Sequence, residues 1–406
     1  MVYKSESRRA RVLAAACCGI AISGGAVCCS AQGQEELEPA IKPGVPASPL
    51  KFGPVDVFFR LNGSVYYDDN IFINRTNRHS DVIGTISPGI TLGVGDYNVK
   101  AESFGLLHYT PSFIFFAENT KQNTIDHDAR LEAQYHPGNL KVGLEQGFQS
   151  FSGPVVDVGN RVDRQLYNTA LSFNYEISPK TSVELDGTQS INRYERFINF
   201  NEWTAAGWFD YELAPKVKIG AGVLGGFVDI QNSVNQTYQQ GLLRASYVLS
   251  EKLTARASAG VELREFESSQ KNKVNGVLSL GATYKPLENT ELILDGHRRD
   301  TTSVVLTNQN YTLTGFNATL RQTFLVKYAL SVGGGYDHAS YHATTQPVVN
   351  APSRRDDYYF ARVGLDWKIS ERLVASVIYE YRRNDSSLSN FGFYNHQVGL
   401  NIAYQF

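Results

Sequence analysis

The last ten residues of the chain alternate between a large apolar residue and a polar or small one. One set consists of Val398, Leu400, Ile402, Tyr404 and Phe406, and the other of Gln397, Gly399, Asn401, Ala403 and Gln405. A period of two places the two sets on opposite faces of a β-strand. The same alternation recurs from Leu253 to Arg264 and from Tyr358 to Trp367, although Asn310 to Gln322 shows no clear apolar face. The sequence therefore predicts strands with one apolar and one polar face.

A second regularity is the spacing of the aromatic residues that precede short turns. Successive members lie 36 to 43 residues apart, and they are Tyr97, Tyr135, Tyr175, Tyr211, Tyr247, Tyr284, Phe324 and Trp367. Longer polar segments, such as Thr344 to Arg354, lie between them. One short turn and one long loop per hairpin is typical of outer-membrane barrels. Outward aromatic side chains at one level suit the interface with lipid headgroups.

Counting these turns predicts the architecture. The eight short turns join strands in pairs, and an opening strand near Val55 to Tyr67 and a closing strand near Ser389 to Phe406 complete the set. We expect an all-β fold, namely a transmembrane up-and-down antiparallel β-barrel of about 18 strands over residues 53–406, with 16 strands as the alternative. Lipid cannot hydrogen-bond a strand edge, so the last strand must pair with the first. A β-propeller repeats at a similar interval but packs four short strands into each period.

Composition agrees with such strands. Aromatic residues make up 12% of the 406 residues, while the mean hydropathy of −0.27 is too low for a helical membrane protein. The formal net charge is −2, which gives no basic surface for nucleic acid. There is no helical periodicity of useful length, so we expect no separate plug domain. The longest candidate obstruction of the lumen is the loop from Thr344 to Arg354.

Residues 1–31 have the features of a cleaved secretory signal. A basic start is followed by a small-residue apolar stretch from Val12 to about Val27, and Ala31 ends a suitable cleavage site before Gln32. All four cysteines lie in this segment, so we expect a mature chain without disulfides or thiol chemistry. A membrane-anchoring helix and a lipoprotein signal at Cys28 or Cys29 are the other interpretations. Residues 32–52 are acidic and Pro-rich, which predicts a disordered periplasmic lead-in.

With lipid outside, the polar face of each strand faces the lumen. The charged residues that we expect to line the pore are Arg130, Glu132, Glu145, Glu184, Arg244, Arg256, Glu262, Arg264, Arg362, Asp366, Glu380 and Arg382. Their mixed signs fit two interpretations. They can select what passes through a pore, or they can form cross-strand salt bridges that stiffen the wall.

No constellation of residues predicts catalysis or a cofactor. The eight histidines are scattered, and the chain has neither an HExxH nor a GxSxG motif. We therefore expect no enzyme, no cofactor and no metal centre. The acidic pairs Asp68-Asp69 and Asp356-Asp357 have a calcium-binding interpretation at the cell surface, but solvated loop acids explain them as well.

Two segments carry resemblances. The end of the chain, with Gly399, Ile402, Tyr404 and Phe406, resembles the C-terminal signal that the barrel-assembly machinery recognises. The second segment lies within residues 66–90 and contains Asp68, Asp69, Asn70, Ile71, Phe72, Ser80, Asp81, Pro88 and Gly89. It resembles the opening hairpin of the putative β-barrel porin 2 family, whose members share an aromatic-Asp-x-Asn-Ile-Phe segment, a Ser-Asp and a Ser/Thr-Pro-Gly. Because members often belong to exopolysaccharide or capsule secretion systems, the resemblance implies a pore and no catalytic residue.

The expected function is a pore in the cell outer membrane, either a conduit that exports an exopolysaccharide or a passage for small solutes. The alternative is a structural or adhesive barrel with a filled lumen and surface loops that bind partners. Expected partners are outer-membrane lipid, the barrel-assembly machinery, and a polysaccharide or the components that export it. No nucleic acid is expected.

The first prediction concerns the N-terminus. Export through a signal peptidase should leave a mature protein that begins near Gln32 and fractionates with the outer membrane, because the segment before it has the charge and residue sizes of a signal. N-terminal sequencing of envelope fractions tests this. Soluble protein that retains Met1 would contradict it.

Overall fold

The computed structural model describes residues 50–97, 102–250, 252–267, 272–345 and 353–406. The predicted signal peptide and residues 32–49 lie outside the described residues. The elements are β1 (Leu50–Phe52), β2 (Val55–Asp68), β3 (Asp81–Gly95), β4 (Phe104–Phe116), η1 (Thr120–Gln122), β5 (Thr124–Tyr135), β6 (Leu140–Val155), β7 (Asn160–Ser178), β8 (Thr181–Tyr194), β9 (Phe200–Ala214), β10 (Val217–Ile230), β11 (Gln236–Ser250), β12 (Leu253–Phe266), β13 (Asn272–Leu287), β14 (Thr290–Thr302), β15 (Gln309–Phe324), β16 (Tyr328–Ala343), β17 (Arg355–Lys368), β18 (Leu373–Ser386), η2 (Ser389–Phe391) and β19 (Phe393–Gln405).

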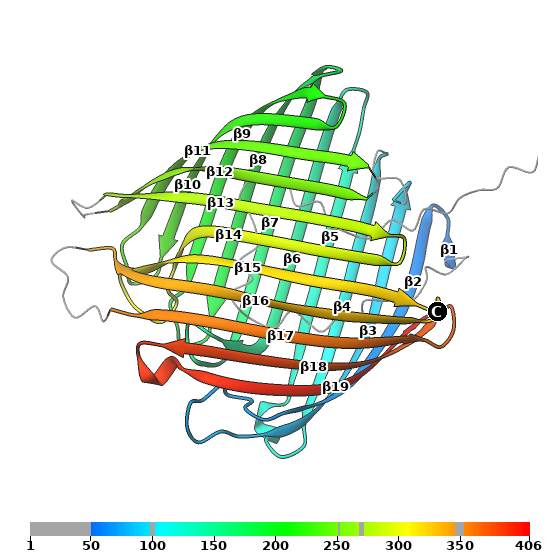
Figure 1. The fold of residues 1–406 in the computed structure, drawn as a ribbon, viewed down its shortest axis with the longest axis vertical. Helices are drawn as coiled ribbons and strands as arrows, with labels where there is room; N and C mark the ends of the chain where they lie inside the picture. The colour runs from blue at the N-terminus through cyan, green and yellow to red at the C-terminus, as the bar shows by residue number, and fades with distance from the viewer. Residues whose placement is uncertain (1–49, 98–101, 251, 268–271, 346–352) are drawn as a thin grey trace, which may run out of the picture.

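Strands β2 to β19 form a closed antiparallel barrel. Each strand pairs with the next one in the chain, and β19 pairs with β2, so the sheet has no open end. The predicted all-β barrel of 18 strands is confirmed, with β1 as an extra strand outside the ring. In Figure 1 the strands of the near wall, β11 to β19, run across the view, whereas those of the far wall run steeply. The two walls cross because the strands of a barrel are tilted relative to its axis.

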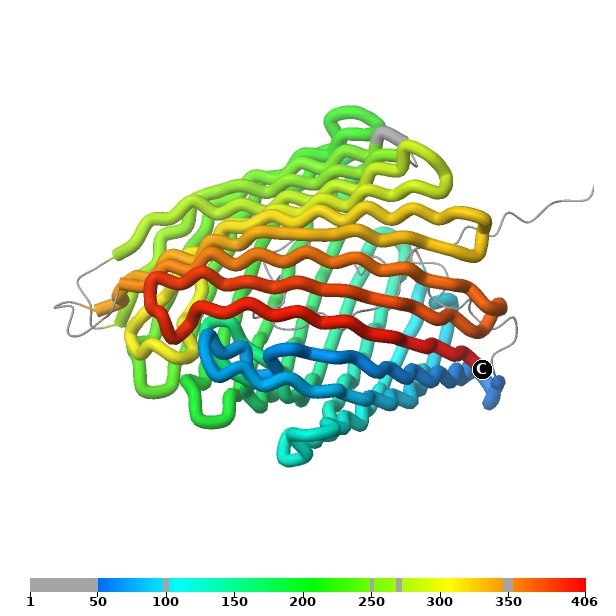
Figure 2. The backbone as a smooth tube through the Cα atoms, turned by 60° about the horizontal axis from the view of Figure 1, so that its bottom comes forward, coloured from blue at the N-terminus to red at the C-terminus, as the bar shows by residue number. Residues whose placement is uncertain are grey.

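The seam between the first and last strands is visible in Figure 2, where β18 and β19 lie beside β2 and β3. β19 pairs with β2 only from Arg60 onward, and the backbone N–H of Phe406 donates to the carbonyl of Phe59 at 3.0 Å. β1 pairs with the remaining edge of β2, with Leu50 opposite Val57. The last three residues of the predicted disordered lead-in therefore form a strand, because they cover an edge that β19 is too short to reach.

The two ends of the barrel differ as the sequence predicts. Connections of two to four residues follow β5, β7, β9, β11, β13, β15 and β17, and eight residues separate β3 from β4, at the end of the barrel that also carries the C-terminus. Aromatic side chains mark this end on the outside, including Tyr135 at 62% exposure and Trp367 at 46%. Outer-membrane barrels place short turns in the periplasm and long loops outside the cell. The end with η1, η2 and the β16–β17 loop is therefore the extracellular end.

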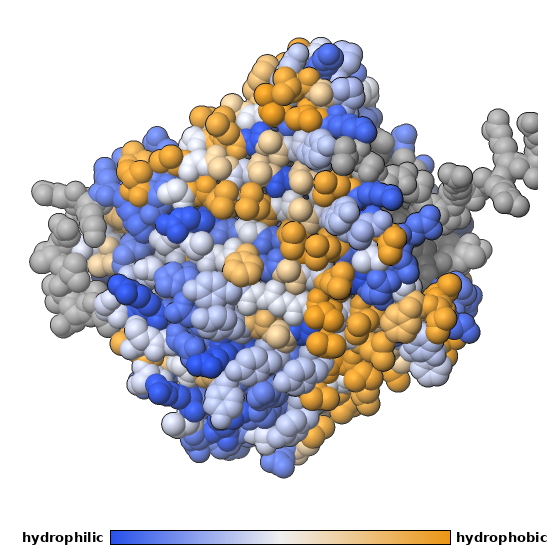
Figure 3. Space-filling view, in the orientation of Figure 1, coloured by the Kyte–Doolittle hydropathy of each residue, from blue (hydrophilic) through white to orange (hydrophobic). Residues whose placement is uncertain are grey.

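The outer face of the wall is apolar. Val223, Leu243 and Leu400 are each more than 60% exposed, which is favourable only where lipid replaces water. On the face shown in Figure 3, hydrophobic side chains form a diagonal band, and hydrophilic side chains cover the lower left of the view. No helix in the described part of the chain is long and apolar enough to cross a membrane.

Charge on the outer side of β19 should prevent assembly. Changing Tyr404 and Phe406 to Asp places two carboxylates on the lipid side of the seam, at a cost of about 1–4 kcal/mol each depending on depth. We expect the double variant to be lost from the outer membrane, with no heat-dependent change in electrophoretic mobility. Gln405→Asp, on the opposite face of the same strand, is the control and should assemble. Normal surface levels of the double variant would refute this expectation.

Candidate functional site

The twelve charged residues that the sequence assigns to the pore all lie on the inner face. Each alternates along its strand with apolar residues of the outer face, as Arg256 does with the exposed Val261 and Leu263 on β12. Several form ion pairs along the wall: Arg244 with Glu184 at 2.6 Å, and Arg362 with Glu380 at 3.2 Å. The structural interpretation therefore applies to these pairs. A role in selecting solutes remains a prediction.

In the part of the chain that the structure describes, inward side chains in the half of the lumen nearer the periplasm are exposed. Arg60, Arg130 and Arg256 point inward from β2, β5 and β12, yet they are exposed. A residue on the inner face of a closed barrel can be exposed only to water inside it. This region is therefore a vestibule lined with solvated charged side chains.

The extracellular half is filled by the end of the β6–β7 hairpin. β5 pairs with β6 only as far as Ser150, and β8 pairs with β7 only from Arg164. Residues 151–163, here called the hairpin tip, pair across the hairpin and with no neighbouring strand. Residues 152–158 are all buried. The tip has left the wall and folded into the mouth of the barrel.

Asp157, in the turn of the tip, reaches elements on the other side of the barrel. Its carboxylate accepts hydrogen bonds from the backbone N–H of Val304 at 2.7 Å and from the hydroxyl of Tyr341 at 2.7 Å. Ser303 Oγ donates at 3.1 Å, and Arg354 Nη1 lies at 3.4 Å. Burial raises the pKa of Asp157 above its ordinary value, while Arg354 and these hydrogen bonds oppose the shift.

Arg354 also binds the backbone of the tip. The guanidinium of Arg354 is fully buried, and its Nη1 donates to the carbonyl of Asp157 at 2.7 Å. It also donates to Asp356 through Nε and Nη2, and it stacks on the rings of Tyr341 and Phe391. A buried cation needs such partners, because an uncompensated charge in this environment is strongly unfavourable.

Apolar contacts seal the other side of the tip. Val155, Val158 and Val162 pack with inward side chains of β9 to β11 in one buried cluster. The wall residues of this cluster include Ala206, Trp208, Leu224, Val228, Tyr238 and Leu242. Val156 packs instead against Ile73, from the loop after β2, and Phe393, the first residue of β19. The tip therefore bridges the mouth from wall to wall.

A second segment also folds inward. β13 pairs with β14 only up to Arg298, and beyond it residues 299–313, here called the shelf, turn into the mouth. Its Asp300 accepts from Lys273 Nζ at 3.2 Å and lies 3.8 Å from Arg264. Arg264 also pairs with Glu262 at 2.8 Å, and Asn310 bonds to Gln236 at 2.8 Å. The shelf thus docks on the inner face of β11 to β13 through a buried polar network.

The tip was not anticipated as an obstruction. The sequence suggested the loop from Thr344 to Arg354, of which residues 346–352 lie outside the described residues, although its two ends are buried. The available signals were the run Val155-Val156-Asp157-Val158 and the length of β7, which at 19 residues is the longest of the described strands.

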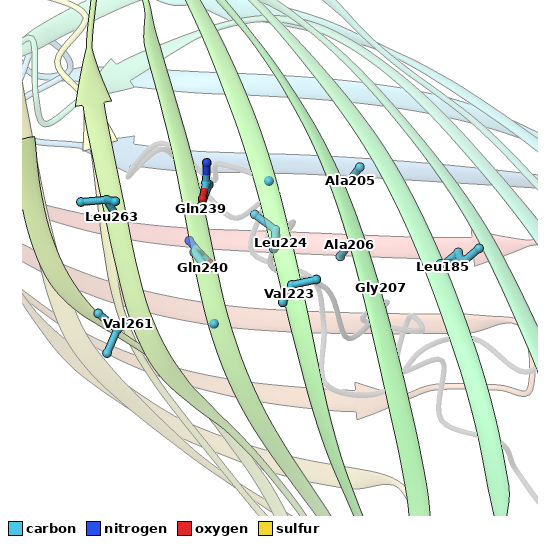
Figure 4. A pocket seen from close by; sticks show the side chains of 12 residues that line it. Leu185, Ala205, Ala206, Gly207, Val223, Leu224, Gln239, Gln240, Val261 and Leu263 are labelled. Atoms are coloured by element: carbon cyan, nitrogen blue, oxygen red, sulfur yellow. The ribbon is translucent and has the colours of Figure 1, made fainter.

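A depression of about 700 Å³ lies on the outer wall and does not belong to the lumen (Figure 4). Leu185, Val223, Val261 and Leu263 surround it, and glycines of β9 to β11 leave its floor without side chains.

Comparison with known proteins places the chain in a family. A model of the putative beta-barrel porin 2 family matches residues 114–406. The chain belongs to this family. It is therefore an outer-membrane channel protein and not an enzyme, as the sequence predicted. The matched region begins after residues 66–90, so the membership rests on the rest of the barrel and not on the segment that carried the resemblance.

Several solved structures resemble the chain over most of its length. This porin resembles Pseudomonas aeruginosa OccK3 (OpdO) with a TM-score of 0.47 and 11% identity, covering 86% of this chain and 96% of that one. It resembles Acinetobacter baumannii OccAB3 with a TM-score of 0.46 and 11% identity, covering 86% and 99%. It resembles the FrpB iron transporter from Neisseria meningitidis with a TM-score of 0.44 and 8% identity, covering 86% of this chain and 81% of that one. No curated protein matches the chain.

In this porin the motif residues of β2 and the loop after it hold the seam closed. Asp68 accepts from Asn395 and Gln397 of β19, the latter at 2.7 Å. Asn70 is fully buried and donates to the carbonyl of Tyr394 at 3.0 Å. Ile71 packs with Ile83 and Phe116, and Phe72 adjoins this cluster. Asp69 accepts from Arg78 and from the backbone N–H of His396 at 2.8 Å.

The remaining motif residues act at β3. Asp81 accepts three backbone N–H bonds from residues 117–119 and so fixes the β4–β5 loop, and Ser80 precedes it. Pro88 lies where the pairing of β3 with β4 is interrupted, and the register on both sides places it opposite Pro111. Two prolines, which have no backbone N–H, therefore lie opposite each other where the hydrogen bonds between β3 and β4 are interrupted. A side chain at Gly89 would collide with Arg60, which crosses it to reach Thr110 at 2.6 Å.

The calcium interpretation of the acidic pairs does not fit these contacts. Asp356 is paired with Arg354, and Asp357 accepts from the hydroxyl of Tyr336 at 2.6 Å and lies 2.8 Å from His338 Nδ1. In the described residues no group of three or more His, Cys, Asp or Glu side chains is placed to hold a metal ion.

Arg264 and Arg256 provide a paired test of the buried network. Both lie on the inner face of β12, but Arg264 is 3% exposed and held by carboxylates, whereas Arg256 is solvated. Arg264→Met should lower the free energy of unfolding by about 3–5 kcal/mol, because it leaves buried carboxylates uncompensated. Arg256→Met should change it by less than about 0.5 kcal/mol. Denaturant titration in lipid vesicles measures both, and equal effects would contradict the assignment.

Proposed function

We propose that this porin is a conduit for the export of a glycan, held shut at the cell surface until its cargo arrives. The observation that carries the proposal is that the two ends of the lumen differ, since one is solvated and the other is filled. The vestibule with Arg60, Arg130 and Arg256 is solvated near the periplasmic end, whereas the hairpin tip and the shelf fill the extracellular end. A polymer that leaves the cell would enter the open side first.

The strength of the closure favours driven export over passive diffusion of small solutes. Three valines of the tip, Val155, Val158 and Val162, are buried against the wall. Burial of a valine side chain contributes about 1.5–3 kcal/mol, so these three together stabilise the closed mouth by roughly 5–9 kcal/mol. Every 1.4 kcal/mol is a factor of ten, and spontaneous opening would be rarer than about one molecule in a thousand.

The second candidate is a structural or adhesive barrel with a permanently filled lumen and loops that bind partners. The buried network around Arg264 and Arg354 favours it, because paired buried charges can fix a single rigid arrangement. The solvated vestibule favours the conduit, since a barrel that only supports loops gains nothing from a hollow interior. Conductance separates the two.

Removing the tip should open the channel. We would replace residues 153–162 by Asn-Gly, which suits a two-residue hairpin turn between Ser152 and Asp163. In planar bilayers the unmodified protein should be almost silent, and the shortened protein should show steady single-channel currents that oligosaccharides of acidic and neutral type reduce. Heat-dependent mobility confirms folding. A folded, shortened protein that stays silent would overturn the conduit and favour the filled barrel.

In the shortened protein, lumen charge should set ion preference. Arg256→Glu should shift the reversal potential toward cations in a salt gradient, because the reversed charge faces the conducting water. Arg383→Glu is the matched control: Arg383 is exposed on the outer face and pairs with Asp385 at 2.9 Å. Arg264 is unsuitable for this test, since reversing it would break the buried network. An Arg256 variant with unchanged selectivity would mean that this face does not line the path.

A further inference from the structure

We propose that the hairpin tip, residues 151–163, is the moving gate of the channel, that it swings out as one body while the shelf stays in place, and that Asp157 is its latch. This inference rests on the proposed conduit and names the element that regulates it.

The hydrogen bonding of the two inward segments decides which one can move. The tip shares no strand ladder with β5 or β8. Its one backbone-to-backbone bond to another element in the described structure joins the N–H of Glu195 to the carbonyl of Asp163, at the base of the tip. The shelf is different, because β15 pairs with β16 along its whole length, up to Gln309 opposite Ala343. Lifting the shelf would break this ladder, and lifting the tip breaks none.

The tip is also built to stay intact when it moves. Its two arms pair from Ser152 opposite Asp163 to Val155 opposite Asn160. Arg161 crosses the hairpin and donates to both the hydroxyl and the carbonyl of Ser152, at 3.1 and 2.7 Å. Gly159 closes the turn with φ +70°, a conformation that glycine adopts without strain. The hinges therefore lie where the neighbouring strands stop pairing, after Ser150 and before Arg164.

The latch leaves no buried charge behind when it opens. In the closed state Asp157 binds the loop at Ser303, the hydroxyl of Tyr341 and the guanidinium of Arg354. Arg354 is also paired with Asp356, at 2.5 Å, through a contact that does not involve the tip. Asp157 sits in the turn, so outward movement carries its carboxylate into water. Both states thus satisfy the charged groups, as a bistable element requires. The valines of the tip keep the closed state as the ground state.

A disulfide lock tests the gate. We would introduce Asp157→Cys together with Ser303→Cys, at two positions whose side chains are in contact at 3.1 Å in the closed state. All native cysteines lie within residues 17–29, in the predicted signal segment, so the new pair has no competitor in the barrel. When oxidised, this protein should be silent in a planar bilayer. When reduced, it has lost the latch, and openings should become on the order of 100-fold more frequent than in the unmodified protein.

A second lock serves as the matched control by tying the shelf instead of the tip. Gln236→Cys with Asn310→Cys joins two positions whose side chains are in contact at 2.8 Å, in a background that carries Asp157→Asn to weaken the latch. Openings should be the same in the oxidised and reduced forms. If the shelf lock silences the channel and the tip lock does not, the shelf is the moving part and the proposal is wrong.

Labelling by a membrane-impermeant maleimide gives a readout that does not need conduction. In a protein that carries Ser303→Cys as its single introduced cysteine, the thiol is covered by the tip when the gate is closed, so labelling reports opening. Labelling that becomes faster when Asp157→Asn is added supports the gate even if no current flows. If the protein without residues 153–162 conducts while the tip lock leaves the current unchanged and Asp157→Asn leaves the labelling rate unchanged, the gate fails and the conduit stands. If that shortened protein is silent, the conduit fails, and labelling alone decides the gate.

Discussion

Every transmembrane sheet must close, because lipid offers no partner for the backbone groups of a free strand edge. In this chain that requirement falls on one seam, where β19 meets β2. Polar side chains beside the seam hold the two strands together. Asp68, Asp69 and Asn70 bind residues of β19, and β1 covers the part of β2 that β19 does not reach. The motif at the start of the barrel thus acts as a closing device.

Closing so many strands into a ring also leaves a wide space inside the barrel. Eighteen strands leave a lumen that wall side chains alone do not fill. The protein solves this differently at its two ends. Near the periplasm the lumen stays wet, with solvated arginines such as Arg256. Near the cell surface the tip and the shelf occupy it, where the buried charges Asp157, Arg354 and Asp300 each have a partner of opposite sign. Such pairing is what makes burial of charge tolerable.

The same pairing explains why the candidate site was only partly predictable. Arg256 and Arg264 are equivalent in the sequence, since both occupy polar positions of one alternating strand. The structure separates them, because the shelf covers Arg264 and leaves Arg256 in water. Asp157 gave no signal of its own, because its partners lie 146 to 197 residues away in the chain. Contacts at such separations depend on how the closed wall brings loops together, so they produce no periodic pattern in the sequence.

The sequence by itself determined the wall of this protein. Side-chain alternation fixed which residues face lipid, the aromatic positions fixed the short turns, and the two together fixed the strand count, since each depends only on neighbours along the chain and on the geometry of a strand. The tertiary structure decided what happens in the lumen. Whether a loop lies outside or folds inward depends on whether its apolar and charged residues find partners across the barrel, as Val158 and Asp157 do. Those partners exist only once the ring has closed.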